Sequence, residues 1–254
     1  MSKTELAPGI IHYAFPPRRE THSFGDSIVA IIDGNNAMLI DVGYEDEAQQ
    51  VIDDLSARCI TIDKIIISHF HADHLFGIHL LPGVPFYGGI GYKETLVYEK
   101  TPDEEMEKYI PSVAVDKPMI LEFGSHKLEL IPFPGHSECT MLTKINGRFL
   151  HIADEVVFSV DGRLSLPYLC NGEKNVKRQR QLASWAKLKD YSEFTIIPAH
   201  GPAFDGDELQ GYLRNLNAYL DVIIESDGKV TYEEAVKSCD YPLLHSNWHE
   251  FNCK

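Results

Sequence analysis

Apolar and polar residues in the first third of the chain follow a pattern that predicts strands joined by one helix. Ser27 to Ile32 is apolar and rich in β-branched residues, and the Asp-Gly-Asn-Asn run at 33–36 is typical of a hairpin turn. Ala37 to Asp41 then returns as a second strand. From Glu45 to Leu55 the apolar residues recur at helical spacing along one face, whereas Lys64 to Ser68 contains a short buried strand.

The remainder of the chain mixes strand and helix patterns without strict alternation. Residues 85–118 form an irregular segment. Strands are expected over residues 127–131, 148–153 and 193–197, and helices over residues 176–189, 208–224 and 231–237. The last helix begins with a capping-box pattern, Thr-Tyr-Glu-Glu from Thr231. This mixture indicates layers of sheets and layers of helices rather than a doubly wound parallel sheet.

The composition indicates how many domains, which kinds of partner and which cellular compartment to expect. A chain of 254 residues with 44% hydrophobic residues suits one large domain, or one domain with a small appendage. The formal net charge of -15 is a poor match for nucleic acid or for an anionic membrane surface. Five scattered cysteines without a C-x-x-C pair favour a reducing compartment. Neither a signal-peptide pattern nor an apolar run of roughly 18 residues occurs, so we expect a soluble, cytoplasmic protein.

A cluster of potential metal ligands directly follows the strand at Lys64 to Ser68. It contains His69, His71, Asp73 and His74. Residues two apart in an extended loop point the same way, so His69 and His71 can reach one ion. If a helix begins near Asp73, then Asp73 and His74 turn toward a neighbouring position. Imidazole and carboxylate ligands of this kind are ordinary zinc chemistry, whereas a polar surface loop would not need four ligands in six residues.

Three more candidate ligands each follow an apolar strand pattern. They are His136, Asp154 and His200. Taken singly, a histidine after Pro-Gly is more often a turn residue, and an aspartate at a strand end is more often a cap. Strand ends at one edge of a sheet bring their loops together, so we expect these three residues to join the histidine-rich loop in one site.

From roughly Ile31 to Pro202 the chain resembles the metallo-β-lactamase superfamily. The matching motifs, in the expected order, are Leu-Ile-Asp-Val-Gly at 39–43, the H-x-H-x-D-H signature at 69–74, Pro-Gly-His-Ser at 134–137, Ala-Asp at 153–154 and Pro-Ala-His-Gly at 198–201. Many members carry a glycine-containing turn just after the third metal histidine, where this chain has Ser-Glu-Cys-Thr at 137–140. The motifs are specific for the superfamily and much less specific for a substrate.

The resemblance implies a four-layer αββα sandwich of two mixed β-sheets flanked by helices. On this basis residues 1–204 are expected to form the metal-hydrolase domain, and residues 205–254 a helical extension packed on the same domain.

The resemblance also implies two divalent ions per chain, with zinc as the first choice and iron or manganese as alternatives. It assigns His69, His71 and His136 to the first ion, Asp73, His74 and His200 to the second, and Asp154 to both. A hydroxide between the ions would be the nucleophile, because metal binding lowers the pKa of water to about 7. Asp73 would in addition accept or relay a proton, and Asp41 would hold the histidine-rich loop without binding metal.

Among the subclasses of the superfamily, the pattern is most similar to hydroxyacylglutathione hydrolases, lactonases and other hydrolases of small thioesters or esters. Antibiotic-hydrolysing members have a cysteine, or no ligand, in place of Asp154, and the nucleases often carry a large insert that this chain lacks. We therefore expect a small-molecule substrate and neither nucleic acid nor membrane as a partner; a homodimer is left open. Two alternatives also remain open: a mononuclear non-haem iron dioxygenase acting on a sulfur substrate, and a non-catalytic sensor or binding protein.

Several further residues could contribute to the site or to the structure. The basic cluster of Lys174, Lys177, Arg178 and Arg180 could attract an anionic substrate or simply form a solvated helix face. Tyr168 could point at the oxyanion of the substrate. Cys139 is a possible extra ligand, although a small buried thiol is the more common case. His151, in the middle of a predicted strand, is read as a core histidine with its hydrogen bonds satisfied.

Overall fold

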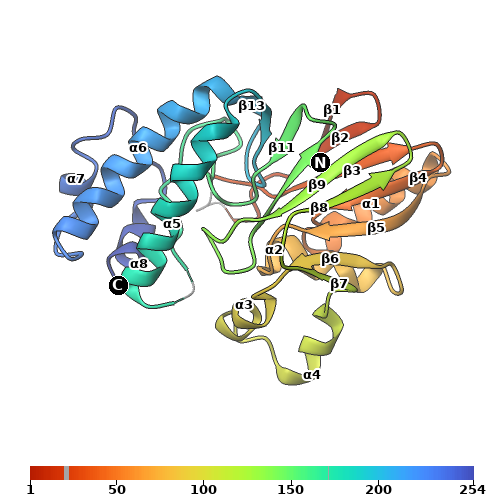
Figure 1. Ribbon diagram of the computed structural model, residues 1–254, viewed down its shortest axis with the longest axis horizontal. Helices are drawn as coiled ribbons and strands as arrows, with labels where there is room; N and C mark the ends of the chain where they lie inside the picture. Colours follow the sequence, from red (N-terminus) through yellow and green to blue (C-terminus); the bar gives the residue numbers. More distant parts are fainter. Residues whose placement is uncertain (20–22, 171) are drawn as a thin grey trace.

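A computed structural model describes residues 1–19, 23–170 and 172–254 of the chain. Within this part, one mixed sheet has seven strands in chain order (Figure 1). They are β1 (Ser2–Ala7), β2 (Ile10–Ala14), β3 (Ser27–Asp33), β4 (Asn36–Ile40), β5 (Thr61–Ile67), β6 (Phe86–Gly89) and β7 (Val113–Val115). Strands β1 to β4 pair antiparallel, and β4 to β7 pair parallel.

A second mixed sheet is built from six strands of the described residues, in the order β13-β12-β11-β10-β9-β8. They are β8 (Met119–Phe123), β9 (His126–Pro132), β10 (Met141–Ile145), β11 (Phe149–His151), β12 (Thr195–Ile197) and β13 (Phe204–Asp205). Only the β11–β12 pair among these is parallel. Its parallel register brings the ends of β11 and β12 to the same edge, and the segments that follow contain Asp154 and His200.

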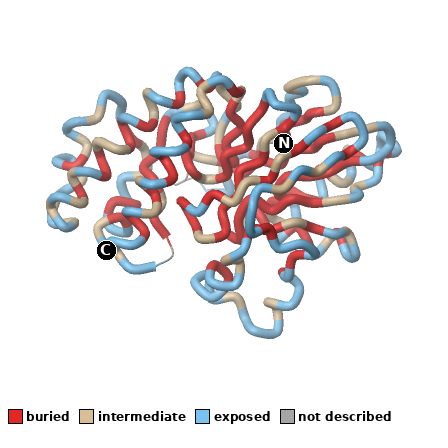
Figure 2. The backbone as a smooth tube through the Cα atoms, viewed as in Figure 1, coloured by how far each residue is buried: buried red, intermediate tan, exposed pale blue. Residues whose placement is uncertain are grey.

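The two sheets pack face to face through alternate apolar side chains. Val29 and Ile66 of the first sheet share one buried cluster with Leu128, Met141 and Ile197 of the second. The intervening residues of each strand face outward, because side chains alternate along a strand. Figure 2 shows the buried residues concentrated along the strands and on the inward sides of the helices.

Helices cover both outer faces and complete a four-layer αββα sandwich. The α-helices are α1 (Glu45–Ala57), α2 (Ala72–Leu75), α3 (Tyr92–Tyr98), α4 (Asp103–Met106), α5 (Lys174–Leu188), α6 (Gly206–Glu225), α7 (Tyr232–Ala235) and α8 (His249–Cys253). Short 3-10 turns are η1 (Phe76–Leu80), η2 (Glu107–Tyr109), η3 (Lys189–Tyr191) and η4 (Ser246–Trp248). Helix α1 packs Val51 and Leu55 on the first sheet, while α5 and α6 cover the second sheet (Figure 1). The predicted fold class is therefore confirmed.

The C-terminal segment shares its core with the second sheet. Leu216 and Tyr219 of α6 belong to the same buried cluster as Leu150 of β11 and Trp185 of α5. The predicted capping box at Thr231 is present, with Thr231 N donating to Glu234 Oε2 over 3.0 Å and Glu234 N donating to Thr231 Oγ1 over 3.3 Å. The division of the chain at residue 204 stays a prediction. No helix among the described residues is long and apolar enough to cross a membrane.

The segment 85–118, predicted to be irregular, contains two strands, two short α-helices and one 3-10 turn. Strand β6 has the sequence Phe-Tyr-Gly-Gly, and glycine is a weak strand former. The glycines are required by close packing, since a Cβ atom on Gly88 would lie 2.5 Å from the ring of Phe70, and one on Gly89 would lie 2.2 Å from the carbonyl oxygen of Cys139. The strand predicted over residues 148–153 is shorter, because Ala153 adopts a positive φ of 50° and turns the chain.

Candidate metal centre

The histidine-rich loop starts where β5 leaves the core. Ile66 and Ile67 are fully buried, so the strand fixes the position from which the loop departs. His71 has the extended ψ of 158°, and α2 begins at the next residue. The backbone therefore changes from extended to helical between His71 and Asp73, which directs the side chains before and after this point to two neighbouring positions. This is the local geometry expected from the sequence.

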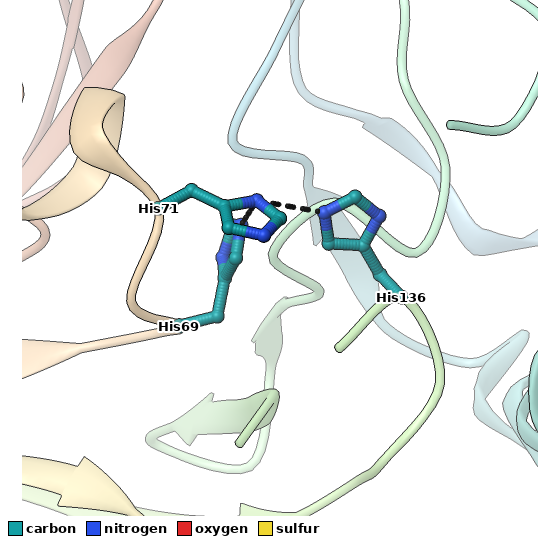
Figure 3. A group of neighbouring side chains, drawn as sticks. All are labelled: His69, His71 and His136. Carbon is teal, nitrogen blue, oxygen red and sulfur yellow. Dashed lines mark hydrogen bonds between the residues drawn. The ribbon is translucent and has the colours of Figure 1, made fainter. Parts of the chain in front are cut away.

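Three imidazole nitrogens converge at the first position. His71 Nδ1 lies 3.0 Å from His69 Nε2 and 3.1 Å from His136 Nε2 (Figure 3). His136 comes from the segment between β9 and β10, on the opposite side of the site from the loop (Figure 3). A tetrahedral zinc ion with bonds of about 2.0–2.1 Å holds its ligand nitrogens about 3.3 Å apart. Both distances from His71 Nδ1 are close to this spacing, and all three nitrogens lie within 4.8 Å of one another.

A second group of donors lies beside the first. His200 Nε2 is 3.5 Å from Asp73 Oδ2, and His74 Nε2 is 3.5 Å from Asp73 Oδ1. Asp154 lies between the two groups: its Oδ2 is 3.3 Å from His200 Nε2, and 3.8 and 3.7 Å from the Nε2 atoms of His69 and His136. The structure thus brings all seven predicted ligands together, and three sets of three donor atoms lie within 4.8 Å of one another.

Two buried polar atoms in this cluster indicate room for a cation. His74 Nε2 and Asp154 Oδ1, 3.5 Å apart, make no hydrogen bond with any described residue. An unsatisfied buried polar atom costs about 1–3 kcal/mol. A metal ion bound between these atoms would satisfy both, so the donor set fits the divalent ion that its chemistry implies.

Burial and charge act differently on the two groups. Burial lowers the pKa of His71 to about 4 and that of His136 to about 3, so the first group is neutral and its nitrogen lone pairs are free to bind metal. Burial alone would also lower the pKa of His200, but the carboxylates of Asp154 and Asp73 hold it well above its usual range. Burial would raise the pKa of Asp154, but His200 and His74 hold it well below its usual range.

Asp41 supports the histidine-rich loop from behind. It is fully buried, and its Oδ1 accepts a hydrogen bond from Ser68 N at 2.7 Å. Its Oδ2 accepts from Ser68 Oγ at 2.7 Å and lies 2.9 Å from His74 Nδ1. These contacts keep the Nε2 atom of His74 directed at the centre, as expected for a carboxylate behind a metal-binding histidine.

A second support, not foreseen from the sequence, holds the segment that carries His136. The buried carboxylate of Glu155 accepts hydrogen bonds from His136 N, Gln181 Nε2 and Ser184 Oγ. Arg180 donates to the carbonyl oxygens of Gly135 and His136 at 2.8 and 3.2 Å. Glu155 directly follows the predicted ligand Asp154, and this position is the one feature of the sequence that could have indicated its supporting role.

Two members of the basic cluster, Lys177 and Arg178, are buried and do not form a solvated helix face. Arg178 is fully buried and donates twice to the carbonyl oxygen of Asn252, and Lys177 donates to the carbonyl oxygens of Leu169 and Phe251. Lys174 pairs with the carboxylate of Asp227 at 2.6 Å. Together with Arg180, these side chains attach α5 to the active-site segments and to the C-terminus, because buried cations need such acceptors.

A cavity of about 650 Å³ opens over the centre. Its described lining includes His71, Asp73, His136, Asp154 and His200 together with Phe24, Tyr44, Tyr168, Trp248 and Phe251. Trp248 and Phe251 come from the C-terminal segment, which therefore forms one wall of the cavity. Burial raises the pKa of Tyr168 to about 12, so its hydroxyl keeps its proton at neutral pH; contact between Tyr168 and a substrate stays a prediction.

Three further buried residues, Cys139, Cys170 and His151, can be compared with what the sequence led us to expect. Cys139 is the expected buried thiol, 3.3 Å from Thr95 Oγ1 and 3.4 Å from Ser137 Oγ. Cys170, to which the sequence assigned no role, lies instead against His71 and His136. His151 is fully buried as expected, but the expectation of satisfied hydrogen bonds is wrong, because its Nε2 has no hydrogen-bond partner among the described residues.

The sandwich and its cluster of histidine and aspartate side chains are those of a metal-binding αββα protein. Residues 23–200 match the family described as the metallo-beta-lactamase superfamily, and the chain belongs to this superfamily. A hydroxyacylglutathione hydrolase from Shewanella denitrificans is 26% identical over 173 residues, which are 68% of this chain and 57% of that relative. The matched region thus spans little more than half of the relative's length.

Solved structures support the same fold. A metallo-beta-lactamase from Pontibacter korlensis is 15% identical with a TM-score of 0.70, over 84% of this chain and 99% of that chain. A beta-lactamase domain protein from Burkholderia ambifaria is 14% identical with a TM-score of 0.67, over 98% of this chain and 84% of that chain. At these identities the likeness concerns the fold.

Removing the carboxylate of Asp41 tests the support of the loop. Asp41→Ala leaves Ser68 N, Ser68 Oγ and His74 Nδ1 without their acceptor, so we expect a loss of about 3 kcal/mol in the free energy of unfolding, measured with denaturant. Metal affinity should fall about 10–100-fold. The matched control is Asp33→Ala, because Asp33 accepts the same pair of bonds from Ser125 N and Oγ on an exposed turn. Equal losses in both variants would contradict a special role for Asp41.

Proposed function

We propose that this chain is a metal-dependent hydrolase that binds two divalent ions and cleaves a small thioester, lactone or related ester. The observation that carries the proposal is the place of the Asp154 carboxylate between a neutral group of three histidines and a second group with Asp73, His74 and His200. Such an arrangement fits two neighbouring ions with a shared carboxylate. The family to which the chain belongs supports this proposal.

The ligand assignment follows the two groups. His69, His71 and His136 would hold one ion, Asp73, His74 and His200 the other, and Asp154 both. Nitrogen and carboxylate donors suit zinc first, while iron and manganese tolerate the same set. The first group consists of neutral imidazoles, whereas the second adds carboxylate charge to offset the second ion.

In the proposed reaction, the protein positions the substrate and handles protons. Bound ions would supply an activated water near neutral pH and polarise the carbonyl group of the substrate. Asp73, whose side chain is 23% exposed, lies at the boundary between the centre and the cavity, where it can accept a proton and pass it to the leaving group. The aromatic residues of the cavity wall would contact an apolar acyl group.

A small substrate is favoured over a polymer by the shape and charge of the molecule. The cavity of about 650 Å³ lies within the range of small-molecule sites. The formal net charge of -15 disfavours a polyphosphate chain. The hydroxyacylglutathione hydrolase relative supports a thioester. The cytoplasmic location and the absence of nucleic-acid and membrane partners stay predictions. A homodimer is left open.

Metal analysis tests the number of ions. Protein purified without chelator and supplied with zinc should contain about two ions per chain, because both groups of donors are complete. Elemental analysis after dialysis measures this value. A reproducible value near one that added zinc or manganese does not change would contradict the proposal and favour the mononuclear iron dioxygenase.

The role of Asp73 is tested by a change that keeps its size. Asp73→Asn removes the charge and the basic oxygen, so kcat should fall by roughly two or more orders of magnitude. The ion at the three-histidine group should remain bound. Asp63→Asn, an exposed residue of β5, serves as the control and should leave kcat unchanged. Near-normal turnover by Asp73→Asn would refute the assigned role.

A substrate panel tests the reaction class. We expect acyl-glutathione thioesters or homoserine lactones to be the best substrates, compared with phosphodiester reporters and structured RNA at equal concentration. The measurement is kcat/KM for each compound with the zinc-loaded protein. Activity on a phosphodiester or RNA at least about tenfold above every acyl compound, or about 1.4 kcal/mol in the barrier, would overturn this choice of substrate class.

A further inference from the structure

In three of the five histidines of the centre, the ring nitrogen that faces away from the cluster lies next to an oxygen atom. His69 Nδ1 lies 3.2 Å from Ser68 Oγ, and His74 Nδ1 lies 2.9 Å from Asp41 Oδ2. His200 Nδ1 lies 3.1 Å from the carbonyl oxygen of Gly25. In each case the contact between Nδ1 and this oxygen atom orients the ring, and Nε2 is directed toward the cluster.

His71 differs from these residues in two ways. Its inward nitrogen is Nδ1, so Nε2 lies on the outer side of the ring. The Sγ atom of Cys170 is 3.6 Å from this Nε2, which is within hydrogen-bond distance for sulfur. Glu99 Oε1 is 3.9 Å away, which is too long for a hydrogen bond between nitrogen and oxygen. Of these two groups, the thiol is therefore the one that can fix the ring of His71.

The same thiol contacts His136. Cys170 Sγ donates to the carbonyl oxygen of His136 at 3.3 Å, and the sulfur lies 3.8 Å from His136 Nε2. Arg180 Nη2 donates to the carbonyl oxygen of Cys170 at 2.9 Å and to that of His136 at 3.2 Å, so the two backbones are tied to one guanidinium group. Cys170 is fully buried, and its contacts link the segments of His71 and His136, which are far apart in the sequence.

We propose that Cys170 is a positioning residue for the three-histidine metal site. Its S–H group donates to the carbonyl oxygen of His136, and its sulfur accepts from the Nε2–H of His71. This arrangement leaves the Nδ1 atom of His71 without a proton and therefore able to bind metal. The proposal rests on the proposed function in so far as the three histidines bind an ion.

Direct binding of the sulfur to the ion is the competing role. A zinc ion with a sulfur bond of about 2.3 Å and nitrogen bonds of about 2.0 Å places sulfur and nitrogen about 3.5 Å apart. The short 3.6 Å contact of Cys170 is with Nε2 of His71, the nitrogen that faces away from His69 and His136. The sulfur also lies 3.8 Å from His136 Nε2, which faces the cluster, but it belongs to none of the three sets of donor atoms that lie within 4.8 Å of one another. The geometry therefore favours a supporting role for the sulfur over direct binding.

Metal affinity is the first measurement. Cys170→Ala should weaken binding of the tighter zinc ion about 10–100-fold in competition with a chelator, the usual effect of losing a supporting contact. Cys170→Ser should restore affinity to within about threefold of the unchanged protein, because a hydroxyl both donates and accepts. Cys139→Ala is the matched control: an equally buried thiol that contacts Thr95 and Ser137 rather than a histidine. Its affinity should stay unchanged, and thermal melting of each variant establishes that it is folded.

Two further measurements separate the outcomes. In the cobalt-substituted protein, a sulfur-to-cobalt charge-transfer band that Cys170→Ala abolishes would show direct binding and overturn the positioning role. Unchanged zinc affinity in Cys170→Ala, or a serine variant as weak as the alanine variant, would overturn it as well. In the metal-free protein, nitrogen NMR should show the Nε2–H tautomer of His71, lost in Cys170→Ala. If the protein binds no metal yet shows this dependence, the proposed function fails, while the orientation of the His71 ring by Cys170 stands.

Discussion

The carboxylate of Asp154 lies among buried histidines, and the need to balance its charge constrains the rest of the structure. Its side chain is 8% exposed, and its two oxygens approach His200, His74, His69 and His136. A buried charge is costly unless opposite charge and hydrogen bonds surround it. The neighbouring groups therefore divide into neutral imidazoles on one side and a charged set with Asp73 on the other. This division is consistent with the two-ion centre that we propose.

The candidate ligands come from segments that the sandwich brings to one edge. The loop after β5 belongs to the first sheet, while the segments after β9, β11 and β12 belong to the second. Three of these four segments have a supporting group: Asp41 behind the histidine-rich loop, Glu155 and Arg180 behind His136, and the carbonyl oxygen of Gly25 behind His200. Rigid supports of this kind are what keep a metal ligand within a few tenths of an ångström of its required position.

The C-terminal segment connects stability to the shape of the cavity. Arg178 and Lys177 of α5 bind the carbonyl oxygens of Asn252 and Phe251, which places Trp248 and Phe251 in the wall over the centre. The basic residues thus act on the substrate site through the backbone of the chain's last residues. A change in these buried cations would be expected to alter substrate selection as well as stability.

The sequence by itself determined the fold class, the central strands and the ligand candidates. Apolar runs such as Ile65-Ile66-Ile67 and the spacing of His69, His71, Asp73 and His74 are local features, so they can be read without knowing the tertiary structure. Strands such as β6 were missed, because Gly88 and Gly89 reflect close packing against Phe70 and Cys139 rather than strand preference. Only the tertiary structure decided that Cys170, rather than Cys139, faces the histidines, and that Arg178 and Arg180 donate hydrogen bonds to backbone carbonyl oxygens of distant segments. These roles depend on contacts between residues far apart in the chain, and hydrophobic periodicity carries no information about which distant groups a polar side chain will meet.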